Sequence, residues 1–166
     1  MTTPQRRTIP ASKKIHIERT FQASPQDVWE MWTTREGIES WWGPEGFRVE
    51  VRTLELRPGG RLDYAMIAAT PEMVAFMKKE GMSGAHETHA TFDEVAPPRR
   101  LVFTHHTDFI PGVAPYDATA VVELEPTAQG TKLVLTLDPM HDETWTQRAV
   151  MGWESELGKL AKVLER

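Results

Sequence analysis

Histidine is the residue type in this chain best suited to metal binding or proton transfer, and four of its six histidines lie in two short clusters. One cluster is His86-Glu87-Thr88-His89 and the other is His105-His106. Both clusters lie in segments with strand-like alternation, where side chains one or three positions apart point to opposite faces. Neither cluster can readily bring both imidazoles to one ion, so the sequence predicts no metal site.

One histidine of each cluster nevertheless shares its phase with apolar neighbours. His86 is in phase with Phe92, and His105 is in phase with Phe103, so each is expected to point into the interior. An imidazole on an apolar wall can orient a carbonyl or a phenol, or move a proton. The alternative is a buried histidine that is satisfied by a backbone carbonyl.

Other large side chains can join these histidines in one ligand-binding wall. Tyr64 and Met66 share a phase on a strand, although an ordinary core would explain them equally well. Opposite-phase neighbours of the wall residues, namely Asp63, Glu87 and Thr104, are polar, as the outer face of a half-buried strand requires. A tryptophan at the mouth and one on the C-terminal helix complete the predicted ligand-binding set, which is Trp41, Tyr64, Met66, His86, Phe92, Phe103, His105 and Trp153.

The local motifs of several enzyme classes are missing. The chain has no Gly-x-Ser-x-Gly elbow, no phosphate-binding Gly-x-x-x-x-Gly-Lys and no Gly-x-Gly-x-x-Gly, and Gly59-Gly60 is better explained as a turn. With no cysteine, the chain also has no thiolate ligand, no cysteine nucleophile and no disulfide. We therefore predict no catalytic residue and no cofactor from these motifs.

Composition limits the class of protein further. A chain of 166 residues with 40% hydrophobic content is the size of one domain with a continuous core. Its net charge of −5 speaks against a nucleic-acid partner. No apolar run is long enough to cross a bilayer, and the first twenty residues lack the apolar centre of a secretory signal. We expect a soluble, cytoplasmic protein without a membrane partner.

The elements that must position the candidate residues follow from periodicity and turn residues. Residues 1–13 are predicted to be a flexible tail, and 14–166 a single domain. Ser24-Pro25 favours the start of a helix, and a second short helix is expected from Thr34. The apolar phase changes after Val51, which predicts a bulge near Arg52-Thr53. Strands are expected around 15–21, 47–56, 62–66, 86–95, 100–107, 116–125 and 131–137, with a short mobile helix at 71–81.

The last segment carries the apolar stripe of a long amphipathic helix. From Asp142 to the end, apolar residues recur at steps of three and four, namely Trp145, Ala149, Trp153, Leu157, Leu160 and Leu164. The order of elements predicts an α+β domain in which a curved antiparallel sheet wraps around this helix, with two short helices after the first strand. A gap between sheet and helix would form an apolar cavity.

Several separated motifs also resemble a known family. They are Phe21-Gln22-Ala23-Ser24-Pro25, Val28-Trp29, Trp41-Trp42-Gly43-Pro44, Leu56-Arg57-Pro58-Gly59-Gly60, and Gly152-Trp153 with Leu157 and Leu160. In this order they resemble bacterial relatives of the activator of heat shock protein 90 ATPase, in the SRPBCC or START-like superfamily. The resemblance covers about residues 14–165 and implies the helix-grip fold, which is START-like and Bet v-like.

The superfamily includes lipid carriers, plant hormone receptors, polyketide cyclases and co-chaperone domains, so the resemblance implies ligand binding, acid–base catalysis or action on a chaperone. We favour non-catalytic binding of a small hydrophobic or aromatic molecule. The alternatives are a domain that acts on the chaperone Hsp90 and a cyclase-like acid–base enzyme that uses His86, His105 or Tyr64. We expect no additional N-terminal domain of the kind that the eukaryotic activators carry, since 166 residues leave no room for one. The sequence leaves monomer and homodimer open.

Overall fold

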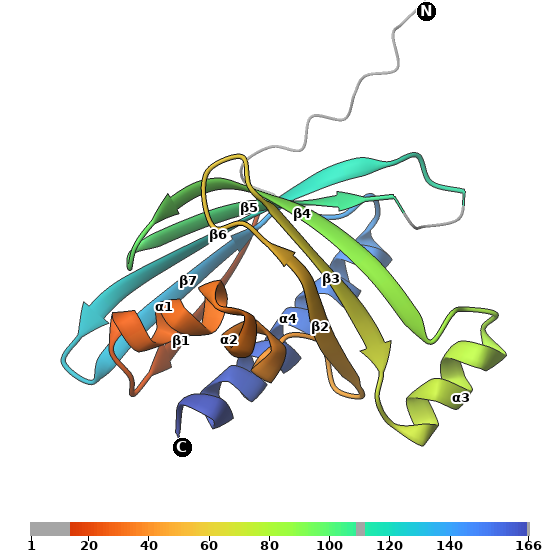
Figure 1. Cartoon of the computed structure of the whole chain (residues 1–166), viewed down its shortest axis with the longest axis horizontal. Helices are drawn as coiled ribbons and strands as arrows, with labels where there is room; N and C mark the ends of the chain where they lie inside the picture. Colours follow the sequence, from red (N-terminus) through yellow and green to blue (C-terminus); the bar gives the residue numbers. More distant parts are fainter. Residues whose placement is uncertain (1–13, 109–111, 166) are drawn as a thin grey trace, which may run out of the picture.

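The computed structural model describes residues 14–108 and 112–165, so the expected tail at 1–13 lies outside the described residues. Its centre is one antiparallel sheet of seven strands in the order β1-β7-β6-β5-β4-β3-β2 (Figure 1). The strands are β1 Ile15–Phe21, β2 Phe47–Leu54, β3 Arg61–Ala68, β4 Ala85–Ala96, β5 Arg100–Thr107, β6 Tyr116–Thr127 and β7 Gly130–Leu137. The helices are α1 Pro25–Thr33, α2 Arg35–Trp41, α3 Pro71–Lys79 and α4 Glu143–Leu164.

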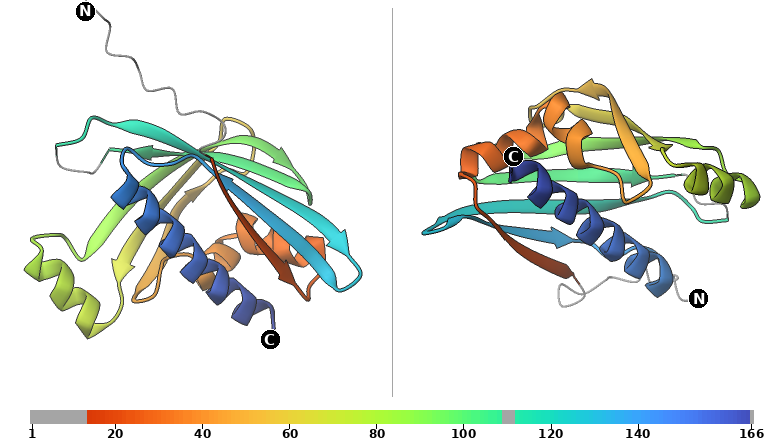
Figure 2. Two further views of the ribbon diagram at one scale, coloured as in Figure 1. Left: turned by 180° about the vertical axis from the view of Figure 1, so that it is seen from behind. Right: turned by 90° about the horizontal axis from the view of Figure 1, so that it is seen from below.

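The curved sheet wraps around α4, which crosses its concave side (Figure 2). The last turns of α4 lie beside α1 and α2, and its first turns lie toward the opposite end of the sheet (Figures 1 and 2). This arrangement confirms the predicted α+β helix-grip fold. No helix within the described ranges is long and apolar enough to cross a bilayer.

Local polar contacts explain where the short helices begin and how α2 meets the sheet. Ser24 caps α1 through the backbone N–H of Asp27, and Thr34 caps α2 through that of Gly37. Glu39 of α2 then accepts a hydrogen bond of 2.8 Å from the backbone N–H of Val51, and Arg35 donates to the carbonyl of the same residue. These contacts satisfy backbone groups on the outer edge of β2.

The predicted bulge in β2 is confirmed, and β4 contains a second irregularity. Val51 pairs with Tyr64 whereas Thr53 pairs with Asp63, so one residue is skipped between them. In β4 the register shifts between Phe92 and Glu94. The shift lets both Phe92 and Val95 contact the core, although their spacing would otherwise place them on opposite faces.

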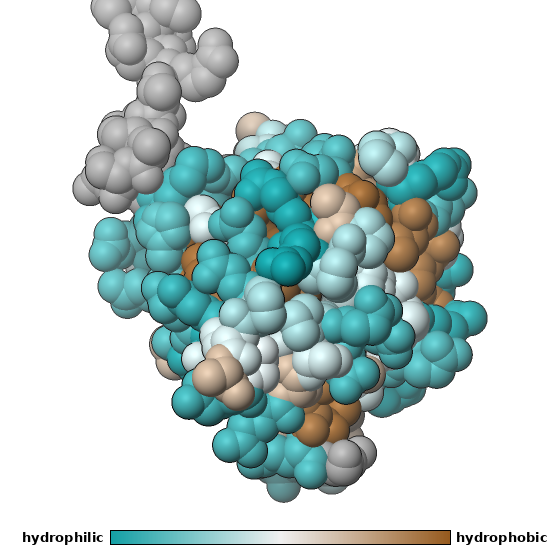
Figure 3. All heavy atoms as spheres, turned by 90° about the vertical axis from the view of Figure 1, so that its left-hand side faces the viewer, coloured by the Kyte–Doolittle hydropathy of each residue, from teal (hydrophilic) through white to brown (hydrophobic). Residues whose placement is uncertain are grey.

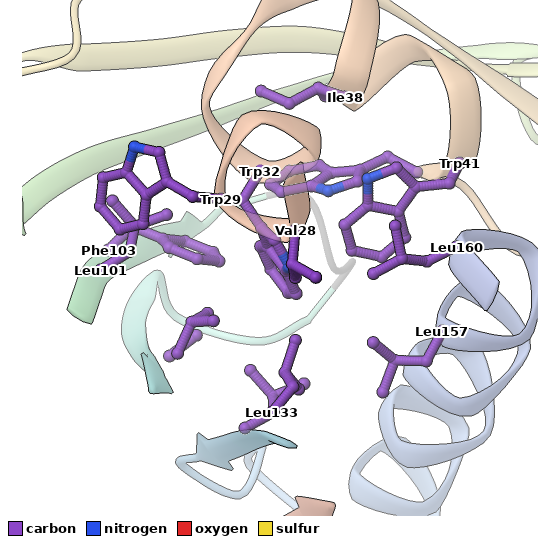
Figure 4. Close-up of a cluster of buried hydrophobic side chains, with 14 of the residues drawn as sticks. Val28, Trp29, Trp32, Ile38, Trp41, Leu101, Phe103, Leu133, Leu157 and Leu160 are labelled. Atoms are coloured by element: carbon purple, nitrogen blue, oxygen red, sulfur yellow. The ribbon is translucent and has the colours of Figure 1, made fainter. Parts of the chain in front are cut away.

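The C-terminal half of α4 holds the core together. Leu157 and Leu160 are fully buried and point toward α1, α2 and β7 (Figure 4). Around them lie apolar side chains from several elements, including Val28, Trp32, Ile38, Trp41, Leu101, Phe103 and Leu133. The first half of α4 differs, because Trp145 and Ala149 are only half-buried. The predicted apolar stripe is therefore a core contact only along its second half.

Helix α3 lies apart from this core. It projects beyond the sheet between β3 and β4 (Figure 1). Met77 is buried, whereas Val74 and Phe76 are exposed to 48% and 54%. Helices that bury so little apolar area open more easily than the strands of a packed sheet, so we expect α3 to be less stable than the strands that it joins.

We predict that Leu157→Ala lowers the free energy of unfolding by about 2–5 kcal/mol, because it leaves a cavity in a fully packed core. Met151→Ala is the matched control on the same helix, since Met151 is 68% exposed, and its effect should stay within about 0.5 kcal/mol. Urea denaturation measures both. Equal effects would show that the second half of α4 does not anchor the core.

We also predict that backbone amides of residues 71–84 exchange with deuterium faster than those in β3 and β4. The physical reason is the small buried area of α3. Hydrogen exchange read by mass spectrometry measures this. Protection of 71–84 equal to that of the flanking strands would contradict it.

Candidate functional site

The strand register brings most of the predicted residues onto one face of the sheet. Met66 pairs with His86, and Tyr64 pairs with Thr88. His105 pairs with Ala90 on one side and with Ala118 on the other. Directly paired residues of antiparallel strands share a face, so these side chains all lie on the concave side.

Burial along this face changes from one end to the other. In the middle of the sheet Phe92, Phe103 and Ala120 are buried completely or nearly so. Toward the end where α4 begins, the side chains keep part of their accessible surface. We call this region the open end; it comprises Met66, His86, Thr88, His105 and Ala118 on the sheet and Trp153 on α4.

An aromatic cluster lies where the open end meets the core. The Trp42 ring lies 5.2 Å from that of Tyr64, 6.0 Å from that of Trp153 and 6.4 Å from that of His105, as centroid distances. Phe103 packs against Trp42 as well, at 5.9 Å. We call these five residues the Trp42 cluster. It gives the open end a rigid floor of aromatic rings.

The neighbouring tryptophans have different surroundings. Trp41, which the sequence placed at a cavity mouth, is fully buried, and its indole N–H donates to the carbonyl of Met31 at 2.8 Å. Trp42 follows the end of α2 and lies in the cluster instead. Trp153 stacks on Trp32 at 5.7 Å yet stays partly exposed. The sequence-based set contained Trp41 and not Trp42, because alternation cannot fix which side a residue faces after a helix ends.

Tyr64 and His105 form a neutral polar pair inside the apolar wall. The Tyr64 hydroxyl lies 2.8 Å from Nε2 of His105. Burial lowers the pKa of His105 to about 4, and burial together with the nearby Glu156 raises the pKa of Tyr64 far above its ordinary value. Near neutral pH the phenol therefore stays protonated and the imidazole uncharged.

A buried carboxylate on α4 holds the loop that follows Trp42. The Glu156 Oε1 atom accepts a hydrogen bond of 2.8 Å from the backbone N–H of Gly43, and Lys159 Nζ donates to the Gly43 carbonyl at 2.7 Å. Ser155 Oγ accepts from the backbone N–H of Glu45. We call Ser155, Glu156 and Lys159 the Gly43 clamp.

The clamp fixes Gly43 in a conformation with a φ of +93°, which glycine adopts without strain. Burial raises the pKa of Glu156 to about 7, against the opposing effects of the Gly43 N–H and of Lys159. Sequence reasoning missed Glu156. Its position between Trp153 and Leu157 on the apolar side of the helix was the available signal.

The remaining candidates fall on both faces of the sheet. Burial lowers the pKa of His86, which lies on the inner face. His89 and His106 lie on the outer face and contact the carboxylates of Asp63 and Asp117 at 2.9 and 2.8 Å. Within residues 14–108 and 112–165, no three His, Asp or Glu side chains are grouped so that they could hold a metal ion.

A shallow hollow of about 250 Å³ lies elsewhere, between α1 and the last turn of α4. No residue of the predicted wall lines it; its lining is Gln22, Ala23, Asp27, Glu30, Met31, Val163 and Leu164. Figure 3 views the molecule from the side that carries α1, where the surface is mainly hydrophilic. This hollow does not overlap the open end.

The curved sheet around α4 and the apolar concave face define a helix-grip protein of the SRPBCC class. Residues 22–165 match the family model described as Activator of Hsp90 ATPase homolog 1-like protein. The chain belongs to this family. No curated protein matches the sequence.

Solved structures of bacterial proteins share the fold. A protein from Chromobacterium violaceum is 24% identical, with a TM-score of 0.77, and the alignment covers 93% of this chain and 99% of that one. The AHSA1 protein from Silicibacter pomeroyi is 23% identical, with a TM-score of 0.71 and coverage of 92% and 97%. An Arthrobacter aurescens protein is 22% identical, with a TM-score of 0.72 and coverage of 95% and 89%. These likenesses establish the architecture.

We predict that Glu156 makes the folded state less stable as pH rises. Its folded pKa of about 7 lies above its ordinary value of 4.5, so its favourable contribution is complete below 4.5 and is lost as pH rises through 7. Between pH 4.5 and pH 8 this loss is about 3 kcal/mol. Glu156→Gln removes the charge and keeps an acceptor for Gly43, so the free energy of unfolding of this variant should lack this loss between pH 4.5 and pH 8.

Urea denaturation of both proteins across this pH range measures the effect, and the difference between them isolates Glu156 from the histidines. A difference that stays constant with pH would show that the carboxylate titrates outside this window.

Proposed function

We propose that this chain binds a small apolar or aromatic molecule at the open end and does not convert it chemically. The observation that carries the proposal is the change in burial along the concave face. Side chains near Phe92 are packed, whereas Met66, His86 and Ala118 on the same face keep accessible surface. Apolar surface that a fold leaves open on its inner side is suited to a ligand.

The chemistry of the wall supports this proposal. Aromatic rings of the Trp42 cluster offer faces and edges for a planar ligand. A few polar groups, namely those of Tyr64, His105 and Thr88, lie among them and can orient a hydroxyl or carbonyl of the ligand. Few polar groups on an apolar wall are typical of small-molecule sites.

The family description favours a second candidate, which is action on the ATPase of Hsp90. That function would use an outer surface and would not require an occupied open end. Measuring Hsp90 ATP hydrolysis with and without this protein tests it. The acid–base enzyme is a third candidate, since Tyr64 and His105 face the same site, and it requires turnover of the bound molecule.

The ligand-binding proposal is tested with N-phenylnaphthylamine, a neutral apolar molecule whose fluorescence rises in apolar surroundings. The wild-type protein should bind about one equivalent. His105→Trp fills the open end and should weaken binding by about tenfold or more. His106→Trp is the matched control, because the adjacent residue points to the outer face, and it should leave binding unchanged.

A second variant that fills the open end shows whether weaker binding by His105→Trp could come from a local folding defect at position 105. Ala118→Leu enlarges the same row from β6 and should weaken binding in the same way. Circular dichroism checks that each variant is folded. Absence of binding to the wild type, or equal weakening by His105→Trp and His106→Trp, would refute the proposed site.

A further inference from the structure

We propose that Glu156 determines the charge of the ligand, so that the open end accepts neutral planar molecules and rejects organic anions such as carboxylates and sulfonates. The inference rests on the proposed function, because it assigns a chemical class to the ligand of that site. It makes Glu156 a specificity-determining residue in addition to its role in the Gly43 clamp.

The buried carboxylate of Glu156 lies next to the chain segment that carries Trp42. On α4 it follows Trp153 by three residues, and its acceptor bond goes to Gly43, the residue next to Trp42. Its negative charge also acts on Tyr64 of β3. Glu156 is thus bonded to the residue after Trp42, lies three residues from Trp153 on α4 and acts electrostatically on Tyr64, although it does not itself form the wall.

The wall provides no cation to offset this charge. Among the described residues that form the open end, none is Lys or Arg. Burial lowers the pKa of His86; Asp108 and Glu87 act to raise it, and His89 of the outer face acts in the opposite direction. An anion in this site would therefore meet like charge without a compensating partner.

Lys159 is the cation near Glu156, and it is already engaged. Its ammonium group donates to the Gly43 carbonyl, on the loop side of α4. Burial lowers the pKa of Lys159, while Glu156 and Glu45 act in the opposite direction. Lys159 therefore bonds the loop side of the clamp and does not supply the wall with a positive group that could hold a carboxylate.

Neutral ligands suit the polar groups that the open end does contain. The Tyr64–His105 pair is uncharged near neutral pH, so it can exchange hydrogen bonds with a phenol, a ketone or an amide. The surrounding rings favour a flat apolar body. Fatty acids and aromatic carboxylates have the apolar part but carry the wrong charge for this site.

A pair of fluorescent molecules with one skeleton separates shape from charge. N-phenylnaphthylamine is neutral, and anilinonaphthalene sulfonate adds a sulfonate to the same rings. At pH 8, where Glu156 is ionised, the wild-type protein should bind the neutral molecule about tenfold or more tightly than the anion. At pH 6, where Glu156 is protonated, this affinity ratio should be smaller, because the anion binds more tightly than at pH 8.

Two glutamine variants identify the responsible carboxylate. Glu156→Gln keeps an acceptor for Gly43 and removes the charge. At pH 8, the ratio of its affinities for the neutral molecule and the anion should equal the ratio that the wild type shows at pH 6. This ratio should not change with pH in the variant. Glu154→Gln removes one charge from an exposed position on the same helix and should behave as the wild type.

The outcomes separate this inference from the proposed function. If the wild type binds both molecules equally at pH 8 and pH 6, the charge selection is wrong while the binding site stands. If neither molecule binds, the proposed function fails. Should Glu156→Gln not fold, the wild-type pH series decides, since a preference that does not change between pH 6 and pH 8 would overturn the role of Glu156.

Discussion

The structure depends on the attachment of α4 to one glycine. Glu156 holds the N–H of Gly43 and Lys159 holds its carbonyl, so both polar backbone groups of a residue 113 positions earlier in the chain are bonded to one helix. Burying a carboxylate is costly unless it is hydrogen-bonded, and this bond offsets part of that cost. The attachment fixes Trp42, and Trp42 in turn contacts three of the predicted wall residues on the sheet, Tyr64, Phe103 and His105.

This attachment lies in the second half of α4 and explains why the two ends of the concave face differ. Leu157 and Leu160 bury themselves beside the clamp, against α1 and α2. A straight helix that is fixed at one end cannot cover the whole concave surface of a curved sheet. The first half of α4 consequently leaves Met66, His86 and Ala118 partly exposed. Packing at one end and access at the other follow from the same geometry.

The sequence predicts well what depends on local alternation and poorly what depends on distant contacts. The bulge near Arg52 was predictable because the apolar phase changes there, and the register confirms it. The inward phases of His86 and His105 follow from the same reasoning. The residues around Glu156 in the sequence do not indicate that its partner is Gly43, which lies 113 positions earlier. Alternation also could not decide whether Trp41 or Trp42 lies at the ligand site. Both answers required the tertiary packing of α4 against the loop after α2.

The most direct test of the open end as the ligand site is a two-dimensional NMR titration of the labelled protein with N-phenylnaphthylamine. If the site is assigned correctly, the largest amide shifts fall on β3 to β6 around Met66, His86, His105 and Ala118, and on α4 around Trp153. Residues 22–31, beside the hollow at the far end of α4, should stay unchanged. Shifts concentrated at residues 22–31, with β3 to β6 and Trp153 unchanged, would contradict it.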